Sequence, residues 1–198
     1  MSTTSSIPIL DSIRTAANQT NADEDVQEGQ RKCIKINVND KIYEFVIWKE
    51  NGIIKSKYEG DFRVIIQKDS LDLIEQLIYV PEVIRYKCRD SNENLIVHVL
   101  CSRGFSKYAK YFTDKENSII GDITGWNALH YACHSDNLQA VESIFRNGDE
   151  RASKIKDRHD NYPIDLTDNE NVRQFLTSSI FDFQTMFRTS YKAAQSIT

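Results

Sequence analysis

Apolar and polar residues alternate between residues 32 and 67, which is the period of β-strands. Residues 33–38 and 41–48 predict two strands joined by the two-residue turn Asn39-Asp40. A second turn signal, Asn51-Gly52, precedes Ile53-Ile54, and the run at 62–66 predicts a further strand. We expect an antiparallel sheet of three to four strands, which is too small to be stable unless it packs on something. The residues expected to share one strand face are Ile34, Ile36 and Val38 in the first strand and Tyr43, Phe45 and Ile47 in the second.

From about residue 70 the hydrophobic period becomes helical. Leu71, Ile74, Leu77 and Ile78 have the spacing of one buried helix face, and Pro81 ends or kinks that helix. Polar, turn-forming segments then recur at nearly fixed intervals, so the remainder is not one long helical bundle.

The intervals reflect an internal repeat. The stretch DITGWNALHYAC begins at Asp122, DRHDNYPIDLTD begins 35 residues later at Asp157, and DSNENLIVHVLC begins 32 residues earlier at Asp90. His98 then aligns with His130. The register continues beyond these stretches and aligns Gly104 with Asp136, Ala109 with Val141, and Phe112 with Ile144.

The repeating unit resembles an ankyrin repeat, whose pattern is D-x-x-G-x-T-P-L-H-x-A-A-x-x-G-H, followed by an apolar second helix and a Gly. The copy at 122–148 keeps Asp, Gly, Leu, His, Ala and the closing Gly, with Asn127-Ala128 in place of Thr-Pro. The copy at 157 keeps Pro163 and ends in the abbreviated form of a terminal repeat. The copy at 90 is the most divergent, and residues 70–87 resemble the second helix of a still earlier unit.

The resemblance implies an α-helical ankyrin-repeat solenoid of about three to four repeats at residues 69–178, each repeat a turn plus two antiparallel helices. With the N-terminal antiparallel β-sheet, the fold class is α+β overall. Since each unit buries its apolar face only by stacking on a neighbour, the end units need covering. We therefore expect the sheet region, 31–68, to cap one end and a helix at 179–198 to cap the other.

Residues 1–30 are polar and acidic, with five acidic side chains and the single basic residue Arg14. This composition predicts a disordered tail. Its apolar island at Ile7-Pro8-Ile9-Leu10 is a docking peptide or simply part of a floppy terminus. The remaining residues are electrically neutral, so no global basic field is present to hold a nucleic acid or an anionic membrane.

The chain has no secretory signal pattern and no apolar run near the roughly 20 residues of a spanning helix. Its four cysteines show no CxxC pairing and are expected to be reduced thiols, three of them buried. We expect a monomeric protein of the cytoplasm or nucleus, or of the host cell interior if a pathogen makes it.

A crowded group, His130, Tyr131, Cys133 and His134, is the main candidate for chemistry. It is a zinc site, a cysteine nucleophile with its base, or part of a packed core. The ankyrin resemblance implies that His130 hydrogen-bonds backbone between repeats, that Cys133 fills a small buried slot, and that His134 begins an exposed helix end. No phosphate-binding loop, G-x-S-x-G or HExxH motif is present. We expect no catalysis, no cofactor and no metal.

The resemblance implies protein–protein binding, as an adaptor or inhibitor, through the concave surface formed by turn tips and the ends of first helices. Trp126 is either an interface hot spot or a packing residue against the adjacent turn. The positions carried over are Ile123, Thr124, Trp126, His134, Ser135, Ser91, Asn92, Asn94, Ser102, Arg103, Arg158, His159 and Asn161.

The alternative function is a transcription cofactor that touches DNA. Residues 31–68 carry nine basic and five acidic side chains with interspersed aromatic residues, and this region resembles an APSES/KilA-N domain. It lacks that family's Trp-Val-Asn-Ala-Thr run.

Overall fold

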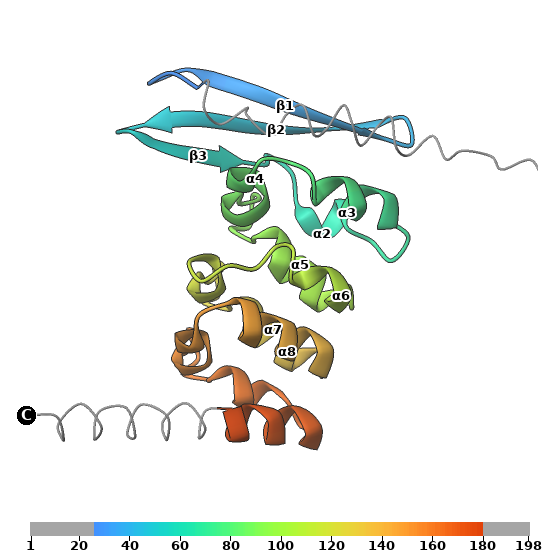
Figure 1. The fold of residues 1–198 in the computed structure, drawn as a ribbon, viewed down its shortest axis with the longest axis vertical. Coiled ribbons are helices and arrows are strands. Elements are labelled where there is room, and N and C mark those ends of the chain that lie inside the picture. The colour runs from blue at the N-terminus through green and yellow to red at the C-terminus, as the bar shows by residue number, and fades with distance from the viewer. Residues whose placement is uncertain (1–25, 180–198) are drawn as a thin grey trace, which may run out of the picture. The chain divides into compact units, whose positions relative to one another are not determined.

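The computed structural model describes residues 26–179, and the chain divides into two compact units, Met1–Arg103 and Gly104–Thr198 (Figure 1). The apolar island at 7–10, most of the acidic tail and the expected C-terminal capping helix lie outside the described residues. In the described part, no helix has the length and apolar character needed to cross a membrane.

The first unit begins with a three-stranded antiparallel sheet in the order β1-β2-β3. The strands are β1 (Arg31–Val38), β2 (Lys41–Glu50) and β3 (Ile53–Lys57). Both connecting turns have two residues with positive φ, 50° and 60° at Asn39-Asp40 and 53° and 76° at Asn51-Gly52. These are the values of type I′ turns, whose twist suits a hairpin. The strands predicted at 33–38 and 41–48 and both turns are confirmed.

The inner face of the sheet packs on helices of the same unit. Ile34, Ile36, Val38, Phe45 and Ile47 are all buried. Helix α3 (Leu71–Leu77) contacts β1, whereas α4 (Glu82–Lys87) contacts β2 and β3. The sheet thus obtains the packing partner that so few strands require.

Aromatic residues of the sheet region form part of this core. The Phe45 ring lies 5.3 Å from that of Tyr58, which stacks on Phe62 at 5.2 Å. Phe45 and Phe62 are fully buried. Three of the five aromatic residues in this region, Phe45, Tyr58 and Phe62, therefore pack against one another in the core.

Residues 62–66 were expected to form a strand, and this prediction is wrong. They form helix α2 (Phe62–Ile65), with Asp61 as N-cap accepting from the Arg63 N–H at 2.7 Å. Phe62 and Ile66 are fully buried while Val64 is 69% exposed, which is helical i, i+4 spacing. The apolar, β-branched run had the composition of a strand but not the burial of one. Helix α2 is therefore the first helix of the earliest repeat, whose first half could not be found in the sequence.

Residues 26–30, which precede β1, contact the sheet. Val26 is buried, and the Gly29 N–H donates to the Lys49 carbonyl at 3.0 Å. The Glu28 carboxylate accepts from the N–H groups of Asn51 at 2.6 Å and Gly52 at 3.1 Å. Residues 26–30, assigned to the tail from the sequence, thus bind to β2 and its turn.

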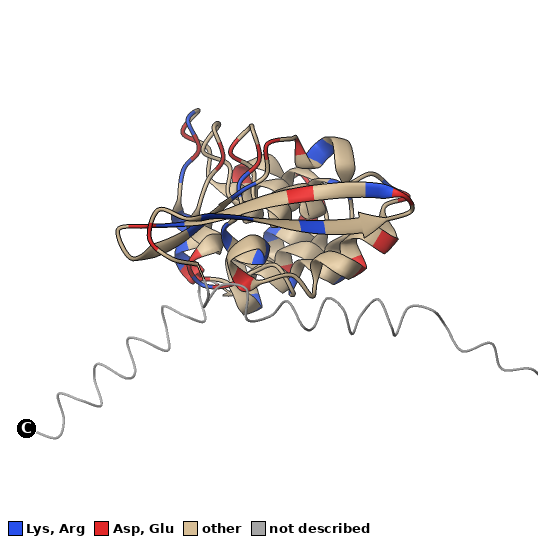
Figure 2. Ribbon diagram, turned by 90° about the horizontal axis from the view of Figure 1, so that it is seen from above, with Lys and Arg blue, Asp and Glu red and all other residues tan. Residues whose placement is uncertain are grey.

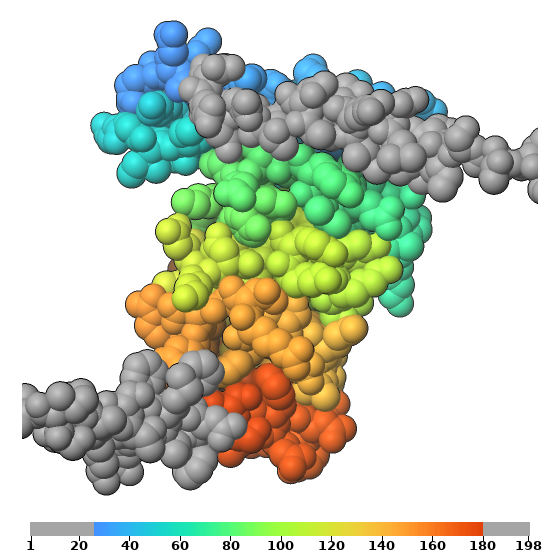
Figure 3. Space-filling model, in the orientation of Figure 1, coloured from blue at the N-terminus to red at the C-terminus, as the bar shows by residue number. Residues whose placement is uncertain are grey.

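The first unit ends with α5 (Ile96–Ser102), which packs on α2 and α4. The second unit contains α6 (Ser106–Ala109), α7 (Ala128–His134), α8 (Leu138–Asn147) and a helical segment at 170–179. Short 3-10 helices, η1 (Asn117–Ile119), η2 (Glu150–Lys154) and η3 (Pro163–Leu166), lie between them. Within this unit α7 packs on α8 and η3. In Figure 3 the orange layer, which contains α7 and α8, is in contact with the red layer that follows it in the chain.

The second unit confirms the register expected from the repeat. Gly104 and Asp136 both have positive φ, 81° and 51°. The aligned residues Ala109 and Val141, like Phe112 and Ile144, are buried. The closing Gly148 is required for space, because a Cβ there would lie 2.6 Å from that of Ser118.

Candidate functional site

Three turns, at residues 90–94, 122–126 and 157–161, share one backbone geometry, and we call them the aspartate turns. In each, the aspartate N–H donates to the carbonyl of the fifth residue at 2.9–3.0 Å, and the fourth residue donates back to the aspartate carbonyl at 3.0–3.2 Å. The fourth residue has a positive φ, 62° at Glu93, 86° at Gly125 and 65° at Asp160. The alignment of the three aspartates from the sequence is therefore confirmed.

In the second unit, the Asp122 side chain holds its own turn together. Its Oδ1 accepts from the backbone N–H groups of Thr124 at 2.8 Å and Trp126 at 3.0 Å, and its Oδ2 accepts from the Tyr131 hydroxyl at 2.6 Å. Burial by itself raises the pKa of Asp122, but hydrogen bonds from Thr124, Tyr131 and Trp126 outweigh it and lower the pKa. Asp122 is thus an ionised structural group.

Asp157 has the same role and also binds to the preceding turn. Its Oδ1 accepts from the N–H groups of His159 at 2.8 Å and Asn161 at 2.9 Å, and its Oδ2 accepts from the Trp126 indole at 2.9 Å. Burial raises the pKa of Asp157, yet these hydrogen bonds lower it overall to about 2. The carboxylate joins two aspartate turns.

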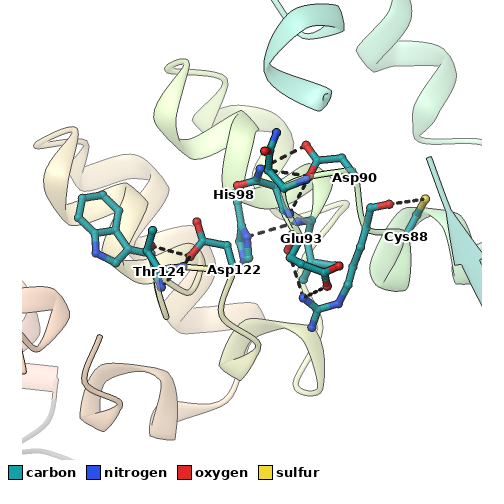
Figure 4. A network of polar contacts seen from close by, with 11 residues as sticks. Cys88, Asp90, Glu93, His98, Asp122 and Thr124 are labelled. Atoms are coloured by element: carbon teal, nitrogen blue, oxygen red, sulfur yellow. Dashed lines mark hydrogen bonds and ion pairs between the residues drawn. The ribbon is translucent and has the colours of Figure 1, made fainter. Parts of the chain in front are cut away.

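In the first unit, the Asp90 carboxylate follows the same plan, as Figure 4 shows. Its Oδ1 accepts from the N–H groups of Asn92 at 2.8 Å and Asn94 at 2.9 Å. Its Oδ2 accepts from the Phe62 N–H at 2.9 Å, which connects this turn to the start of α2. His98 lies in the slot of His130, and its Nδ1 accepts from the Leu95 N–H at 3.3 Å.

His130 is fully buried and connects one repeat to the next. Its Nδ1 lies 3.2 Å from the Asn127 backbone nitrogen and 2.8 Å from the Asn127 Oδ1, and its Nε2 lies 3.3 Å from the Asn161 carbonyl. With the proton on Nε2, the ring donates to the Asn161 carbonyl. Burial lowers the pKa of His130, and the Asn161 contact and nearby aspartates offset this only in part. The backbone hydrogen bond between repeats expected for His130 is confirmed.

Trp126 is half-buried within an aromatic group of the second unit. Its ring lies 5.0 Å from His134 and 5.2 Å from Tyr131, edge to face in both cases. Together with the indole hydrogen bond to Asp157, these contacts hold the ring in one orientation. Trp126 packs against the adjacent turn while leaving part of its surface exposed.

The tips of the two aspartate turns in this unit are also joined directly. The Arg158 N–H donates to the Thr124 carbonyl at 3.1 Å. A Cβ on Gly125 would lie 3.2 Å from the Arg158 nitrogen and 3.3 Å from the Asp157 Cα. Glycine suits this position because of the close approach and a φ of 86°.

Most residues predicted for the binding surface are exposed. In the second unit Ile123 is 56% exposed, and Thr124, His134, Ser135, Arg158 and His159 are exposed as well. In the first unit Ser91, Ser102 and Arg103 are exposed and Asn92 is half-buried. Neither an ion pair nor a side-chain hydrogen bond connects Arg158 to another described residue.

The prediction that Asn94 is an exposed contact residue is wrong, because its side chain is fully buried. Its amide donates to Asp90 at 3.2 Å, and its Oδ1 accepts from Arg63 at 3.1 Å. Asn94, Trp126 and Asn161 all occupy the fifth position of an aspartate turn, whose N–H binds the aspartate and whose side chain turns inward. The alignment of the three aspartates places these three residues at one position, which is the sequence signal for the inward slot. The predicted binding surface also lacked the charged tip residues Glu93 and Asp160.

Cys133 is fully buried, and burial raises the pKa of its thiol to about 12. The thiol is therefore held protonated, without the thiolate that a cysteine nucleophile needs. Cys88 and Cys101 are buried too, whereas Cys33 is exposed, so the predicted number of buried thiols is confirmed. Among the described residues, no three His, Cys, Asp or Glu side chains gather in a group that could hold a metal ion.

Comparison with known proteins finds a family match over the helices and turns described above. A family model described as ankyrin repeats, in three copies, matches residues 62–154. No curated protein matches the chain. Ankyrin repeats are generally non-catalytic modules of protein–protein interaction. The match begins at α2 and includes the aspartate turns at 90–94 and 122–126, so residues 62–154 of this chain are ankyrin repeats.

Proposed function

We propose that this protein is a non-catalytic adaptor or inhibitor that binds another protein through exposed positions of its repeats. In the second unit the surface consists of the tip residues Ile123, Thr124, Arg158 and His159 and the end of α7 at His134 and Ser135. Ser91, Asn92, Ser102 and Arg103 contribute from the first unit. Free cysteines are consistent with a reducing compartment, so we place the protein in the cytoplasm or nucleus.

The proposal rests on how the second unit holds its two aspartate turns. The two turns of the second unit are fixed to each other by the Arg158–Thr124 backbone hydrogen bond and the Trp126–Asp157 side-chain bond. On this rigid base they expose an apolar side chain, Ile123, and a cation without a described partner, Arg158. A turn whose backbone is already fixed presents these side chains with little further loss of backbone entropy on binding, and Arg is enriched in interface hot spots.

The test compares Arg158→Glu with a matched charge reversal, Arg146→Glu, on exposed α8. Affinity capture with quantitative mass spectrometry should identify proteins that wild type and Arg146→Glu retain and Arg158→Glu loses. Each candidate is then titrated as a purified protein, and we expect Arg158→Glu to lose at least 2 kcal/mol of binding free energy, roughly the level of a hot spot. Equal retention of every captured protein by both variants would contradict this surface.

A further inference from the structure

One edge of the sheet in the first unit is unoccupied among the described residues. β1 pairs with β2 on one side, and no described strand pairs with its other side. Val38 and Lys41 close a two-residue turn and therefore form a hydrogen-bonded pair. Because pairs alternate along an antiparallel ladder, the backbone groups of Ile34 and Ile36 face β2.

The same alternation directs the other backbone groups of β1 outward. The N–H and carbonyl groups of Arg31, Cys33, Lys35 and Asn37 lie along the free edge, and the side chains of these residues are exposed. Such a row is a template for pairing with another strand. β1 has eight residues and contains neither proline nor glycine, so its edge is uninterrupted.

The charge on this strand is of one sign. β1 carries Arg31, Lys32 and Lys35 and no acidic residue. Lys35 pairs with Glu44 of the neighbouring strand at 2.6 Å, whereas Arg31 and Lys32 form no ion pair with a described residue. Figure 2 shows the sheet face-on, with Lys and Arg in blue and Asp and Glu in red.

Exposed apolar side chains lie on the helix beneath this edge. Helix α3 contacts β1 but α4 contacts β2 and β3, so α3 lies under the β1 side of the sheet. The Asn39 amide donates to Asp72 at 3.0 Å, which ties the start of α3 to the end of β1. Leu71 at the start of α3 is 41% exposed, and Tyr79 just after its end is 40% exposed.

We propose that the β1 edge binds an extended segment of a partner protein in which acidic residues alternate with apolar ones. The segment adds a fourth strand, with backbone hydrogen bonds to the free edge supplying affinity. Its outward acidic side chains pair with Arg31 and Lys35 across the strands, since opposite charges facing each other stabilise a sheet. Its inward apolar side chains extend over the α3 flank at Leu71 and Tyr79.

A second copy of this chain fits the edge less well. Pairing two β1 strands would bring basic side chains of both copies onto one small face, and like charges opposite each other are destabilising. The charge of the edge therefore favours an acidic partner strand. This surface belongs to the sheet, so it is separate from the repeat surface proposed above and its test has an independent outcome.

The test uses the full chain and a labelled, end-capped ten-residue peptide that alternates Glu with Val, with a Lys-Val peptide as control. Fluorescence anisotropy should show binding of the acidic peptide only. Cys33→Pro removes one outward N–H, which an edge strand tolerates, while Cys33→Thr keeps it. We expect Cys33→Pro to weaken binding at least about tenfold and Cys33→Thr to bind within about twofold of wild type.

Two further measurements locate the strand. Lys35→Glu should also weaken binding about tenfold through like-charge repulsion, and it serves if the proline variant does not fold. Hydrogen exchange of the complex should slow at the amides of Cys33, Lys35 and Asn37. Equal binding of both peptides, or unchanged binding to Cys33→Pro and Lys35→Glu, would overturn the proposal. So would binding that appears only after removal of residues 1–25, or an edge occupied by a second copy in sedimentation analysis.

Discussion

Replacing Asp157 by Asn disrupts the bond that joins two repeats, together with the longer hydrogen bond that Oδ2 accepts from the Asn161 amide at 3.3 Å. The Asn side chain keeps an oxygen for the N–H groups of His159 and Asn161, which are 2.8 and 2.9 Å from Oδ1. It places an NH₂ where Oδ2 accepted from the Trp126 indole at 2.9 Å. An indole N–H only donates, so two donors then face each other.

The expected loss is about 2 kcal/mol. A hydrogen bond to a charged acceptor contributes about 1.5–3 kcal/mol, and a buried donor without an acceptor has a similar cost. For a chain of this length, that loss lowers the melting temperature by about 4–8 °C.

Asp122→Asn is the matched control. Its Oδ2 accepts from the Tyr131 hydroxyl at 2.6 Å, and a hydroxyl can rotate to accept from the new NH₂. We therefore expect a smaller loss than for Asp157→Asn. Trp126→Phe completes a double-mutant cycle, in which removing the indole N–H should cost about 1 kcal/mol less in the Asp157→Asn background than in the wild-type background.

Chemical denaturation monitored by circular dichroism measures these free energies, and pH gives a further check. A carboxyl group whose pKa is lower in the folded than in the unfolded protein stabilises the fold above the unfolded value. For Asp157 that contribution is complete above pH 3.8 and is lost as pH falls toward about 2. The difference between wild type and Asp157→Asn should shrink over this window. Equal losses for both Asn variants, or a cycle without coupling, would refute the reasoning.

Three other predictions concern the same scaffold. Gly125→Ala should cost about 1–3 kcal/mol of stability, because its φ is 86° and a Cβ would lie 3.2 Å from the Arg158 nitrogen; unchanged denaturation would contradict the required close approach. Because folding lowers the pKa of His130, the neutral ring stabilises the fold above pH 6.5, and this stabilisation is lost as pH falls below that value. Wild type should therefore lose stability below pH 6.5 more steeply than His130→Gln, as measured by melting at a series of pH values. Deleting residues 31–57 should lower the melting temperature sharply by uncovering α3 and α4, and an unchanged transition would show that the sheet is an independent module.

Elements whose hydrogen bonds join residues close in sequence could be predicted from the sequence alone. Both hairpins follow from two-residue turns with left-handed residues. The aspartate turns follow from a side chain that binds N–H groups two and four residues onward, and they appeared in the alignment at the correct positions. Helix periodicity likewise placed Ile74 and Leu77 in a buried face, but the same prediction was wrong for Leu71, which is 41% exposed.

Tertiary structure decided what depends on residues far apart in sequence. The run at 62–66 became a helix in a fold where the Phe62 N–H binds Asp90, 28 residues later. Asn94 turned inward to meet Arg63, and Trp126 was held by Asp157, 31 residues onward. A sequence pattern shows which side chains can donate or accept, but only the folded chain brings their partners within hydrogen-bonding distance. For that reason the repeat could be predicted from the sequence, whereas the division of its turn residues between exposed and buried could not.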